Sequence, residues 1–275
     1  MTVVEALSHD RVHGIRVGRF RSRLDTTCIL YRLDDVLIDT GPPNQWSVVR
    51  RFARQGALRR VVLTHHHEDH AGNLARLGST TDIEILAPEP SRARLSSGSS
   101  LRAYQRVVWG TPRRVEARPV PDRIELADGG CLLAVPAPGH SVDMTCYLEP
   151  ERGWLFTGDL YVTARPRYLR ADEDISQEMH SLRSVLELDF DTIFCAHRGI
   201  LTAGKQALQR KLDHLSALCE RVRELRDRGE SERRITRKLL GREDFLSFVT
   251  GFHYSKRNLV RACLAQDDHS ERQPG

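Results

Sequence analysis

The chain has 275 residues, of which 40% are hydrophobic and 29% are charged, and its formal net charge is +5. This length excludes a peptide and suits one large domain or a domain with an appendage, while the composition excludes a disordered or fibrous chain. No run approaches the roughly 20 apolar residues that span a bilayer, and residues 1–10 contain no apolar stretch of signal-peptide length. We therefore expect a cytoplasmic protein that contacts no membrane.

The cysteines and the net charge give weaker indications. Six scattered cysteines without a Cys-x-x-Cys pair favour reduced, mostly buried thiols. The charge surplus lies in residues 201–275, which hold 16 Lys and Arg against 11 Asp and Glu, whereas residues 1–200 hold 26 of each sign. A surplus of this size is compatible with nucleic acid, with a protein partner or with no partner.

The first part of the chain predicts strands. Residues 27–32 and 36–39 are short β-rich runs separated by a turn-like Leu-Asp-Asp, and residues 47–55 have apolar residues at helical spacing. Residues 60–64 form a compact apolar run that is typical of a buried strand. This run leads directly into six polar residues, 65–70, which is an unusual end for a strand.

The pattern weakens over residues 88–123, which carry eight arginines against three acidic residues. We interpret this segment as a solvated surface excursion; the alternative is a basic loop over a functional site that attracts an anionic substrate. Short apolar runs before and after it predict further strands at residues 83–87, 124–126, 131–135, 145–148, 154–157 and 193–196.

The chain changes to helical character after residue 205. Apolar residues recur every three or four positions and predict one amphipathic helix that Gly229 ends: Leu208, Leu212, Leu215, Leu218, Val222 and Leu225. Ser231 and Ser255 precede two shorter helical patterns and resemble N-caps. We interpret these helices as a cap or a dimer contact whose leucine stripe packs on a core; nucleic-acid binding by the basic tail is the alternative.

Residues 65–70, His-His-His-Glu-Asp-His, carry the densest set of metal-ligand side chains in the chain. Imidazole and carboxylate groups bind zinc, iron or manganese, and a loop that leaves a strand presents several of them to one point. His65 and His67 project to the same side of an extended backbone, and Asp69 and His70 follow at the turn into the next helix. One stretch therefore suits two adjacent ions, whereas a histidine-rich loop without function is the alternative.

Three further residues that could bind a metal each follow a short apolar run: His140, Asp159 and His197. Together with H-x-H-x-D-H at residues 65–70, their order resembles the signature of the metallo-β-lactamase superfamily, over residues 27–201. The resemblance implies an α/β (α+β) fold, an αββα sandwich of two mixed β-sheets flanked by helices. We accordingly expect a metallo-β-lactamase-like domain at residues 1–201 and a C-terminal helical extension at residues 202–275, packed on or beside it.

The family's ligand pattern, carried over to this sequence, implies two zinc ions, with iron or manganese as alternatives. It places His65, His67 and His140 on the first ion, Asp69, His70 and His197 on the second, and Asp159 as a bridge between them. Two divalent cations are then nearly neutralised by two carboxylates and a bridging hydroxide, which suits a buried site. The residues around Asp39 resemble the family's early aspartate loop, which packs near the metals without binding them.

This set of ligands predicts hydrolysis. A bound cation lowers the pKa of its water to about 7, so hydroxide forms at neutral pH without a nucleophilic serine or cysteine. Asp69 is the predicted catalytic residue, because its carboxylate can orient the water or take up its proton.

Other side chains near the motif are weaker candidates. By strand alternation His66 and Glu68 face away from the ligands, and we expect His66 at the surface. Tyr161 is expected to pack in the core rather than to stabilise an oxyanion, and Cys195 to be a buried thiol rather than a sulfur ligand. Three histidines in helical stretches are interpreted as ordinary residues: His180, His214 and His253.

The superfamily spans many reactions, so the resemblance alone does not select one. We expect a glyoxalase II-like hydrolase that acts on a thioester, lactone or similar ester of a small molecule or acyl carrier. Two alternatives stay open: a mononuclear iron persulfide dioxygenase, and a nucleic-acid-processing hydrolase that uses the basic helical tail. A homodimer is compatible with each of them.

Overall fold

The computed structural model describes residues 3–20, 26–79, 82–98 and 100–270. The packing of the chain separates two compact units. The first comprises Met1–Ala137, Val142–Val162 and Asp189–Gly204, and the second comprises Pro138–Ser141, Thr163–Leu188 and Lys205–Gly275. The domain boundary expected at residue 201 stays a prediction.

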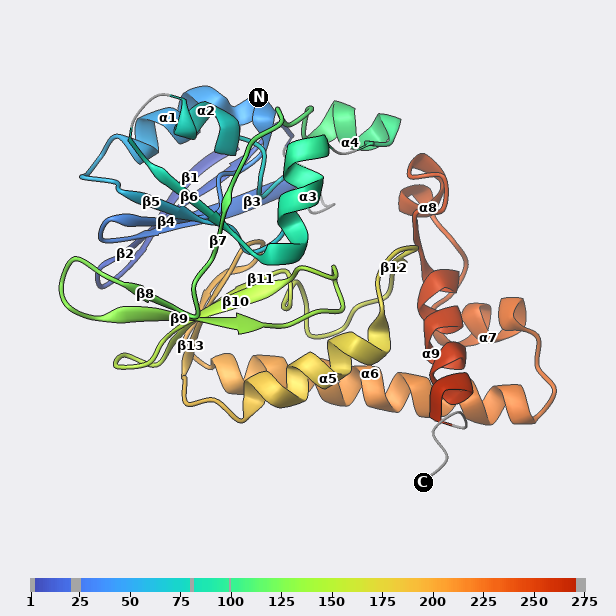
Figure 1. The fold of residues 1–275 in the computed structure, drawn as a ribbon. Coiled ribbons are helices and arrows are strands. Elements are labelled where there is room, and N and C mark those ends of the chain that lie inside the picture. The colour runs from blue at the N-terminus through green and yellow to red at the C-terminus, as the bar shows by residue number, and fades with distance from the viewer. Residues whose placement is uncertain (1–2, 21–25, 80–81, 99, 271–275) are drawn as a thin grey trace. The chain divides into compact units, whose positions relative to one another are not determined.

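The first unit contains a seven-stranded sheet whose strands follow one another in chain order (Figure 1). The strands are β1 (Val3–His9), β2 (Val12–Gly18), β3 (Thr27–Leu33), β4 (Val36–Ile38), β5 (Arg60–Val62), β6 (Glu84–Ala87) and β7 (Arg118–Pro119). Neighbours from β1 to β4 pair antiparallel, and neighbours from β4 to β7 pair parallel. The tight turn between β3 and β4 confirms the predicted hairpin, with Asp34 in the left-handed region at φ 51°.

The second sheet of this unit has six strands in the order β14-β13-β11-β10-β9-β8. They are β8 (Arg123–Glu125), β9 (Cys131–Pro136), β10 (Thr145–Glu149), β11 (Trp154–Gly158), β13 (Thr192–Cys195) and β14 (Gly199–Leu201). β11 and β13 pair in parallel and their neighbours pair antiparallel, so both sheets are mixed. The strands predicted after residue 123 are confirmed, with small shifts of their ends.

Two apolar layers hold these elements together. Between the sheets, Phe156 and Phe194 are 1% exposed, and their rings stack with centroids 4.6 Å apart. On the other face of the first sheet, α1 (Trp46–Ala53) and α2 (Leu74–Gly78) pack through a second buried cluster. The layers of this unit are therefore helices, first sheet and second sheet, in that order (Figure 1).

Most of the described residues within 88–123 are exposed or half-buried, as a surface excursion predicts, but the helices that they form were not predicted. They form two short helices, α3 (Glu89–Ser97) and α4 (Ala103–Val108), before β7. Ser91 and Leu95 of α3 are buried, so this helix packs on the unit rather than projecting into solvent. The sequence lacks a helical apolar pattern here because Leu95 is the one large apolar residue that α3 contributes to the buried cluster.

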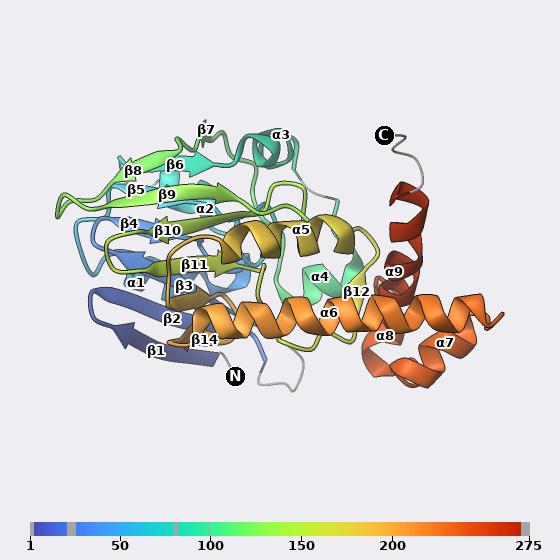
Figure 2. The same cartoon turned by 90° about the horizontal axis from the view of Figure 1, so that it is seen from below.

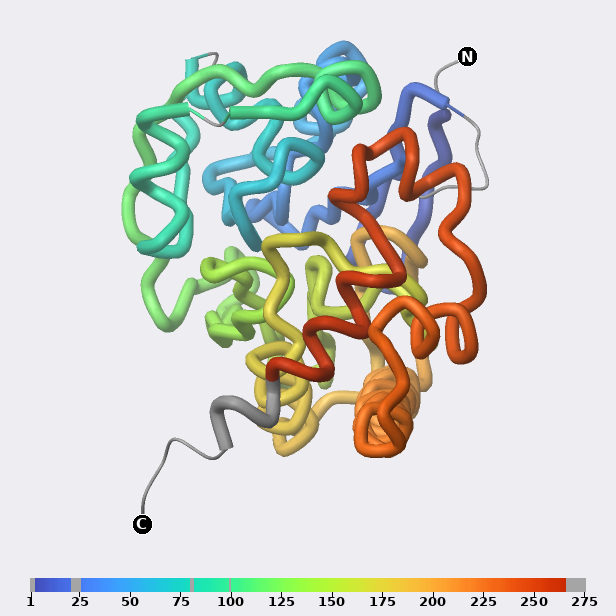
Figure 3. Tube along the Cα trace, turned by 90° about the vertical axis from the view of Figure 1, so that its right-hand side faces the viewer, coloured from blue at the N-terminus to red at the C-terminus, as the bar shows by residue number. Residues whose placement is uncertain are grey.

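The second unit is largely helical, with a two-stranded ladder of β12 (Leu169–Arg170) and β15 (Tyr254–Ser255). Its helices are α5 (Ile175–Leu186), α6 (Gly204–Asp227), α7 (Glu232–Leu239), α8 (Phe245–Val249) and α9 (Lys256–Ser270). α5 and α6 run side by side (Figure 2), and Lys211 Nζ lies 2.5 Å from Glu178 Oε1 between them. From α6 the chain folds back through α7 and α8 to α9 (Figure 3).

The predicted tail helices are confirmed. The leucine stripe of α6 is buried, except for the half-buried Leu225. Ser231 occupies the N-cap position of α7, and the hydroxyl of Ser255 accepts the backbone N–H of Arg257 at 3.0 Å at the start of α9.

Two expectations concern the chain as a whole. Within the part of the chain that the structure describes, no helix combines the length and the apolarity that a bilayer span requires. The six cysteines of the sequence are buried there and form no disulfide bond, as predicted.

Candidate functional site

The ligand-rich motif lies at the carboxyl end of β5, which is paired on both sides with β4 and β6. The carboxyl ends of parallel strands are where such sheets expose functional groups. Thr64 fixes the start of the motif, because its backbone N–H and its hydroxyl both donate to the carboxylate of Asp39, each at 2.8 Å. The ends of β4 and β5 are therefore tied together just before the first histidine.

Asp39 also orients His70. Nδ1–H of His70 donates to Asp39 Oδ2 at 2.7 Å, and Nε2 on the other side of the ring lies 3.4 Å from Asp159 Oδ1 and 3.8 Å from Asp69 Oδ2. A carboxylate that fixes the tautomer and the ring orientation is the usual outer partner of a metal-binding histidine. Asp39 packs against the motif, as expected of the early aspartate loop.

We expect Asp39→Asn to weaken metal binding by about 10- to 100-fold, because the amide holds the His70 tautomer less firmly than the carboxylate does. Asparagine also tolerates the left-handed backbone of Asp39, whose φ is 62°, so the loop is expected to keep its shape. The measurement is a competition titration of zinc against a coloured chelator. Asp35→Asn, which removes a buried carboxylate paired with Arg60, is the control and is expected to leave the affinity unchanged.

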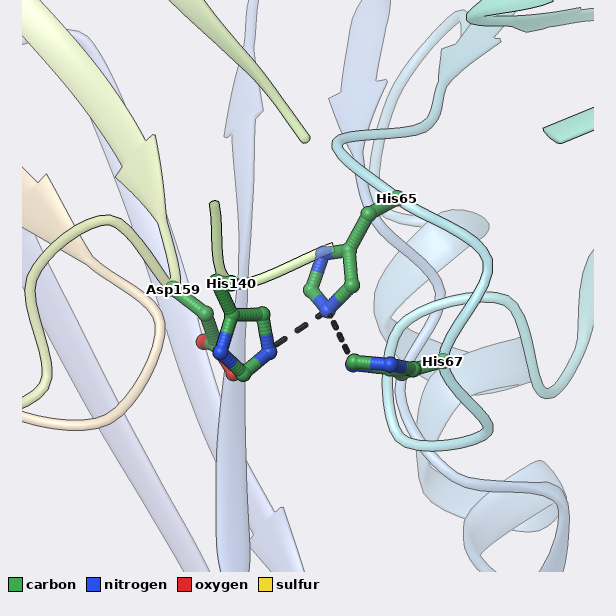
Figure 4. A group of neighbouring side chains, drawn as sticks. All are labelled: His65, His67, His140 and Asp159. Carbon is green, nitrogen blue, oxygen red and sulfur yellow. Dashed lines mark hydrogen bonds and ion pairs between the residues drawn. The ribbon is translucent and has the colours of Figure 1, made fainter. Parts of the chain in front are cut away.

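Among the residues that the structure describes, candidate ligand atoms gather in three groups of buried side chains. Within each group the atoms lie within 4.8 Å of one another, and the groups are His65, His67, His140 and Asp159; His70, Asp159 and His197; and Cys28, Asp69 and His70. Figure 4 shows the imidazoles of the first group turned toward one another. All seven residues predicted as ligands belong to these groups, and their role as ligands stays a prediction.

Further contacts hold the imidazoles in place. Nδ1–H of His197 donates to the carbonyl of Thr27 at 2.7 Å, and its Nε2 lies 3.1 Å from Asp159 Oδ1. Nε2 of His65 points at Nδ1 of His67, 2.8 Å away. Two imidazole nitrogens that face each other need a proton or a cation between them. A metal ion that displaced this proton would find nitrogen donors of the kind that zinc binds.

The electrostatics of the cluster point the same way. Burial alone would lower the pKa of His70, but the carboxylates of Asp159, Asp39 and Asp69 outweigh it and raise the pKa well above its ordinary value. Nε2 of His70 is buried and makes no hydrogen bond within the described residues. Nitrogen and carboxylate donors around one buried point match the ligand preferences of zinc, and a metal ion competes there with the proton.

One expectation about the motif is wrong: His66 does not lie at the surface. Its side chain is 9% exposed, because Nδ1 lies 2.9 Å from Oδ1 of the buried Asp143. Glu68 is in none of the three ligand groups, as expected, although it is only 4% exposed.

The sulfur atoms near the site divide into two kinds. Cys195 is in none of the ligand groups, and its Sγ accepts the backbone N–H of His197 at 3.3 Å, so it shapes the turn that carries this histidine. Cys28 of β3, in contrast, has its thiol in the group with Asp69 and His70. Sequence reasoning missed Cys28, because no spacing links residue 28 to residues 69–70 and only the fold brings them together. Tyr161 is buried, as expected.

Comparison with known proteins agrees with this geometry. The family model described as Metallo-beta-lactamase superfamily matches residues 23–197. "Thioesterase pkgB" of Emericella nidulans is 32% identical over 131 residues, which are 45% of this chain and 32% of that protein. "Atrochrysone carboxyl ACP thioesterase" of Aspergillus fumigatus is 27% identical over 208 residues, which are 74% of this chain and 60% of that protein. The matched part of this chain thus spans less than two thirds of either relative.

The fold is also shared with solved structures. A metallo-beta-lactamase family protein from Thermus thermophilus superposes with a TM-score of 0.69 at 18% identity, over 96% of this chain and 95% of that one. This likeness confirms the predicted αββα fold class. Since the family model covers more than half of the sequence and contains the whole ligand motif, the chain belongs to the metallo-beta-lactamase superfamily.

Proposed function

We propose that this chain is a metal-dependent hydrolase that cleaves a thioester of a small molecule or acyl carrier, with a lactone or another ester as the alternative substrate. The observation that carries the proposal is the buried cluster of histidines and aspartates at the carboxyl end of β5. The thioesterase names of two similar proteins support the choice of a thioester.

The proposed ligand sets are His65, His67 and His140 for one ion and Asp69, His70 and His197 for the other, with Asp159 shared. The position of Asp159 supports its role as a shared ligand, because its carboxylate belongs both to the group of His65 and to the group of His70. We propose zinc as the metal; iron and manganese accept the same donors and are the alternatives.

Metal ions held by these residues would supply a water that ionises near neutral pH and a Lewis acid for the carbonyl of the substrate. The chain's own residues set the geometry for that water. Oδ2 of Asp69 lies 3.8 Å from Nε2 of both His70 and His197, so this carboxylate borders the point where the donors converge. Asp69 can therefore orient the attacking water and accept its proton, while Asp39 and the Thr27 carbonyl keep the two imidazoles aligned.

The test is a substrate screen with the zinc-loaded protein, using acyl thioesters, lactones and a phosphodiester. We expect hydrolysis of thioesters at the highest kcat/KM. Faster cleavage of the phosphodiester would favour nucleic-acid processing instead. Oxygen uptake on a persulfide by protein that holds one equivalent of iron would favour the dioxygenase alternative. Either of these two results would contradict the proposal.

A further inference from the structure

The middle histidine of the motif, His66, belongs to a hydrogen-bonded chain that the proposed metal chemistry does not use. The carboxylate of Asp143, which is 2% exposed, accepts the backbone N–H of His66 at 2.8 Å and lies 2.9 Å from Nδ1 of its ring. The same carboxylate accepts the hydroxyl of Ser91 on α3 at 2.5 Å. Asp143 therefore ties the metal-ligand motif to helix α3.

Arg94 of α3 completes this chain from the solvent side. Its Nη1–H donates to Nε2 of His66 at 2.8 Å. Because a guanidinium has no acceptor, Nε2 must be the accepting nitrogen, so the ring proton sits on Nδ1 and donates to Asp143. Arg94 thus donates to His66, and His66 donates to Asp143. These two hydrogen bonds fix the position of the guanidinium.

The charge of Arg94, unlike that of Arg92 and Arg118, is not paired with a carboxylate among the described residues. Arg92 on the same helix pairs with Glu89, and Arg118 of β7 pairs with Glu84. Arg94 is exposed, and within the described residues it forms no ion pair with a carboxylate. Its remaining N–H groups are therefore available to an anionic oxygen from outside the chain.

The position of Arg94 relates it to the candidate metal site. The ring of His66, to which Arg94 is bonded, lies with its centroid 4.8 Å from that of His67. His67 is one of the grouped ligand residues. The guanidinium is accordingly held one imidazole ring away from the proposed ligands, and all the residues of this chain of contacts belong to the first unit.

We propose that Arg94 is a substrate-binding residue that recognises an anionic oxygen group, a carboxylate or a phosphate, of the molecule whose ester is cleaved. This inference rests on the proposed thioester hydrolysis. The planar fork of a guanidinium fits two oxygens of either anion at once, and its hydrogen bond to His66 orders the side chain in advance. His66 and Asp143 act through Arg94, as the residues that hold it.

The experiment compares three acetyl thioesters that differ at one end: those of 3-mercaptopropionate, 2-mercaptoethyl phosphate and the neutral 3-mercaptopropionamide. We expect the zinc-loaded protein to prefer a charged thioester, and the better of the two charged ones identifies the anion. Arg94→Gln is expected to lower kcat/KM for that substrate by about 10- to 100-fold, mainly through KM, and to leave the amide unchanged. The control is Arg118→Gln, which replaces an exposed arginine of the same segment. This variant is expected to leave kcat/KM unchanged for all three thioesters.

A binding measurement separates this inference from the proposed function. The thioether 3-(methylthio)propionate carries the carboxylate without a cleavable bond, and its binding is measured by calorimetry. Equal kcat/KM values for charged and neutral thioesters, with equal losses in Arg94→Gln, would overturn the role of Arg94 and leave thioester hydrolysis standing. Binding of the thioether by the unsubstituted protein but not by Arg94→Gln, without turnover of any thioester, would overturn thioester hydrolysis and support the anion site.

Discussion

Asp69→Ala is expected to lower kcat/KM for thioester hydrolysis by roughly 10³-fold and to reduce the metal content of the same sample. The two losses are linked, because the carboxylate is both a proposed ligand of the second ion and the proposed proton acceptor of the attacking water. Its Oδ2 lies 3.8 Å from His70 Nε2 and from His197 Nε2, so the carboxylate borders the nitrogens of both proposed histidine ligands. The measurement combines steady-state kinetics with elemental analysis on one preparation.

Two variants make the result interpretable. Asp69→Asn keeps the size of the side chain and removes its charge, so we expect most of the activity loss with a smaller loss of metal. Asp122→Ala removes an exposed aspartate far from the motif in sequence and serves as the control, with unchanged kinetics and metal content. Full turnover by Asp69→Ala with a normal complement of metal would show that this carboxylate has neither role.

Phe194→Ala is expected to lower the free energy of unfolding by about 3–5 kcal/mol, the usual cost of removing a fully buried aromatic ring. Phe194 is 1% exposed, stacks on Phe156 at 4.6 Å and meets the edge of Tyr31 at 5.5 Å, so its loss opens a cavity between the two sheets. The strand that carries it, β13, ends two residues before His197. We therefore expect weaker metal binding in this variant as well. Urea unfolding measures its stability, and a metal titration then measures its affinity.

The matched control is Phe245→Ala. Phe245 is 70% exposed on α8, so the same truncation removes little buried surface and is expected to leave the unfolding midpoint nearly unchanged. If the two phenylalanine variants lost equal stability, the packing of the two sheets through Phe194 would not be the source of the effect.

Several of the strands that sequence patterns predicted are buried on both faces. β4, β5 and β10 read as short apolar runs bounded by turn residues, and this pattern follows directly from burial on both sides of a sheet. The hairpin of β1 and β2 has no such signal, because most residues of β1 are exposed or half-buried. Helix α3 lacked one for a related reason, since few of its residues face the core.

The candidate site was predictable to the extent that its residues are close in sequence or follow strands. The motif at residues 65–70 and the later His140, Asp159 and His197 all sit where apolar runs end, and the structure brings them into shared groups. The partners that orient them could not be found this way. The contacts of His70 with Asp39, and of His66 with Asp143, join residues 31 and 77 positions apart, and single aspartates are too common for their spacing to be informative.

Two proposed zinc ions per chain make the metal content of the purified protein the decisive measurement, taken together with its thioester hydrolysis before and after chelation. We expect two equivalents of zinc per chain, loss of hydrolysis when a chelator removes them, and recovery when zinc is returned. Protein that contains no transition metal, or hydrolysis that continues unchanged after chelation, would contradict this expectation.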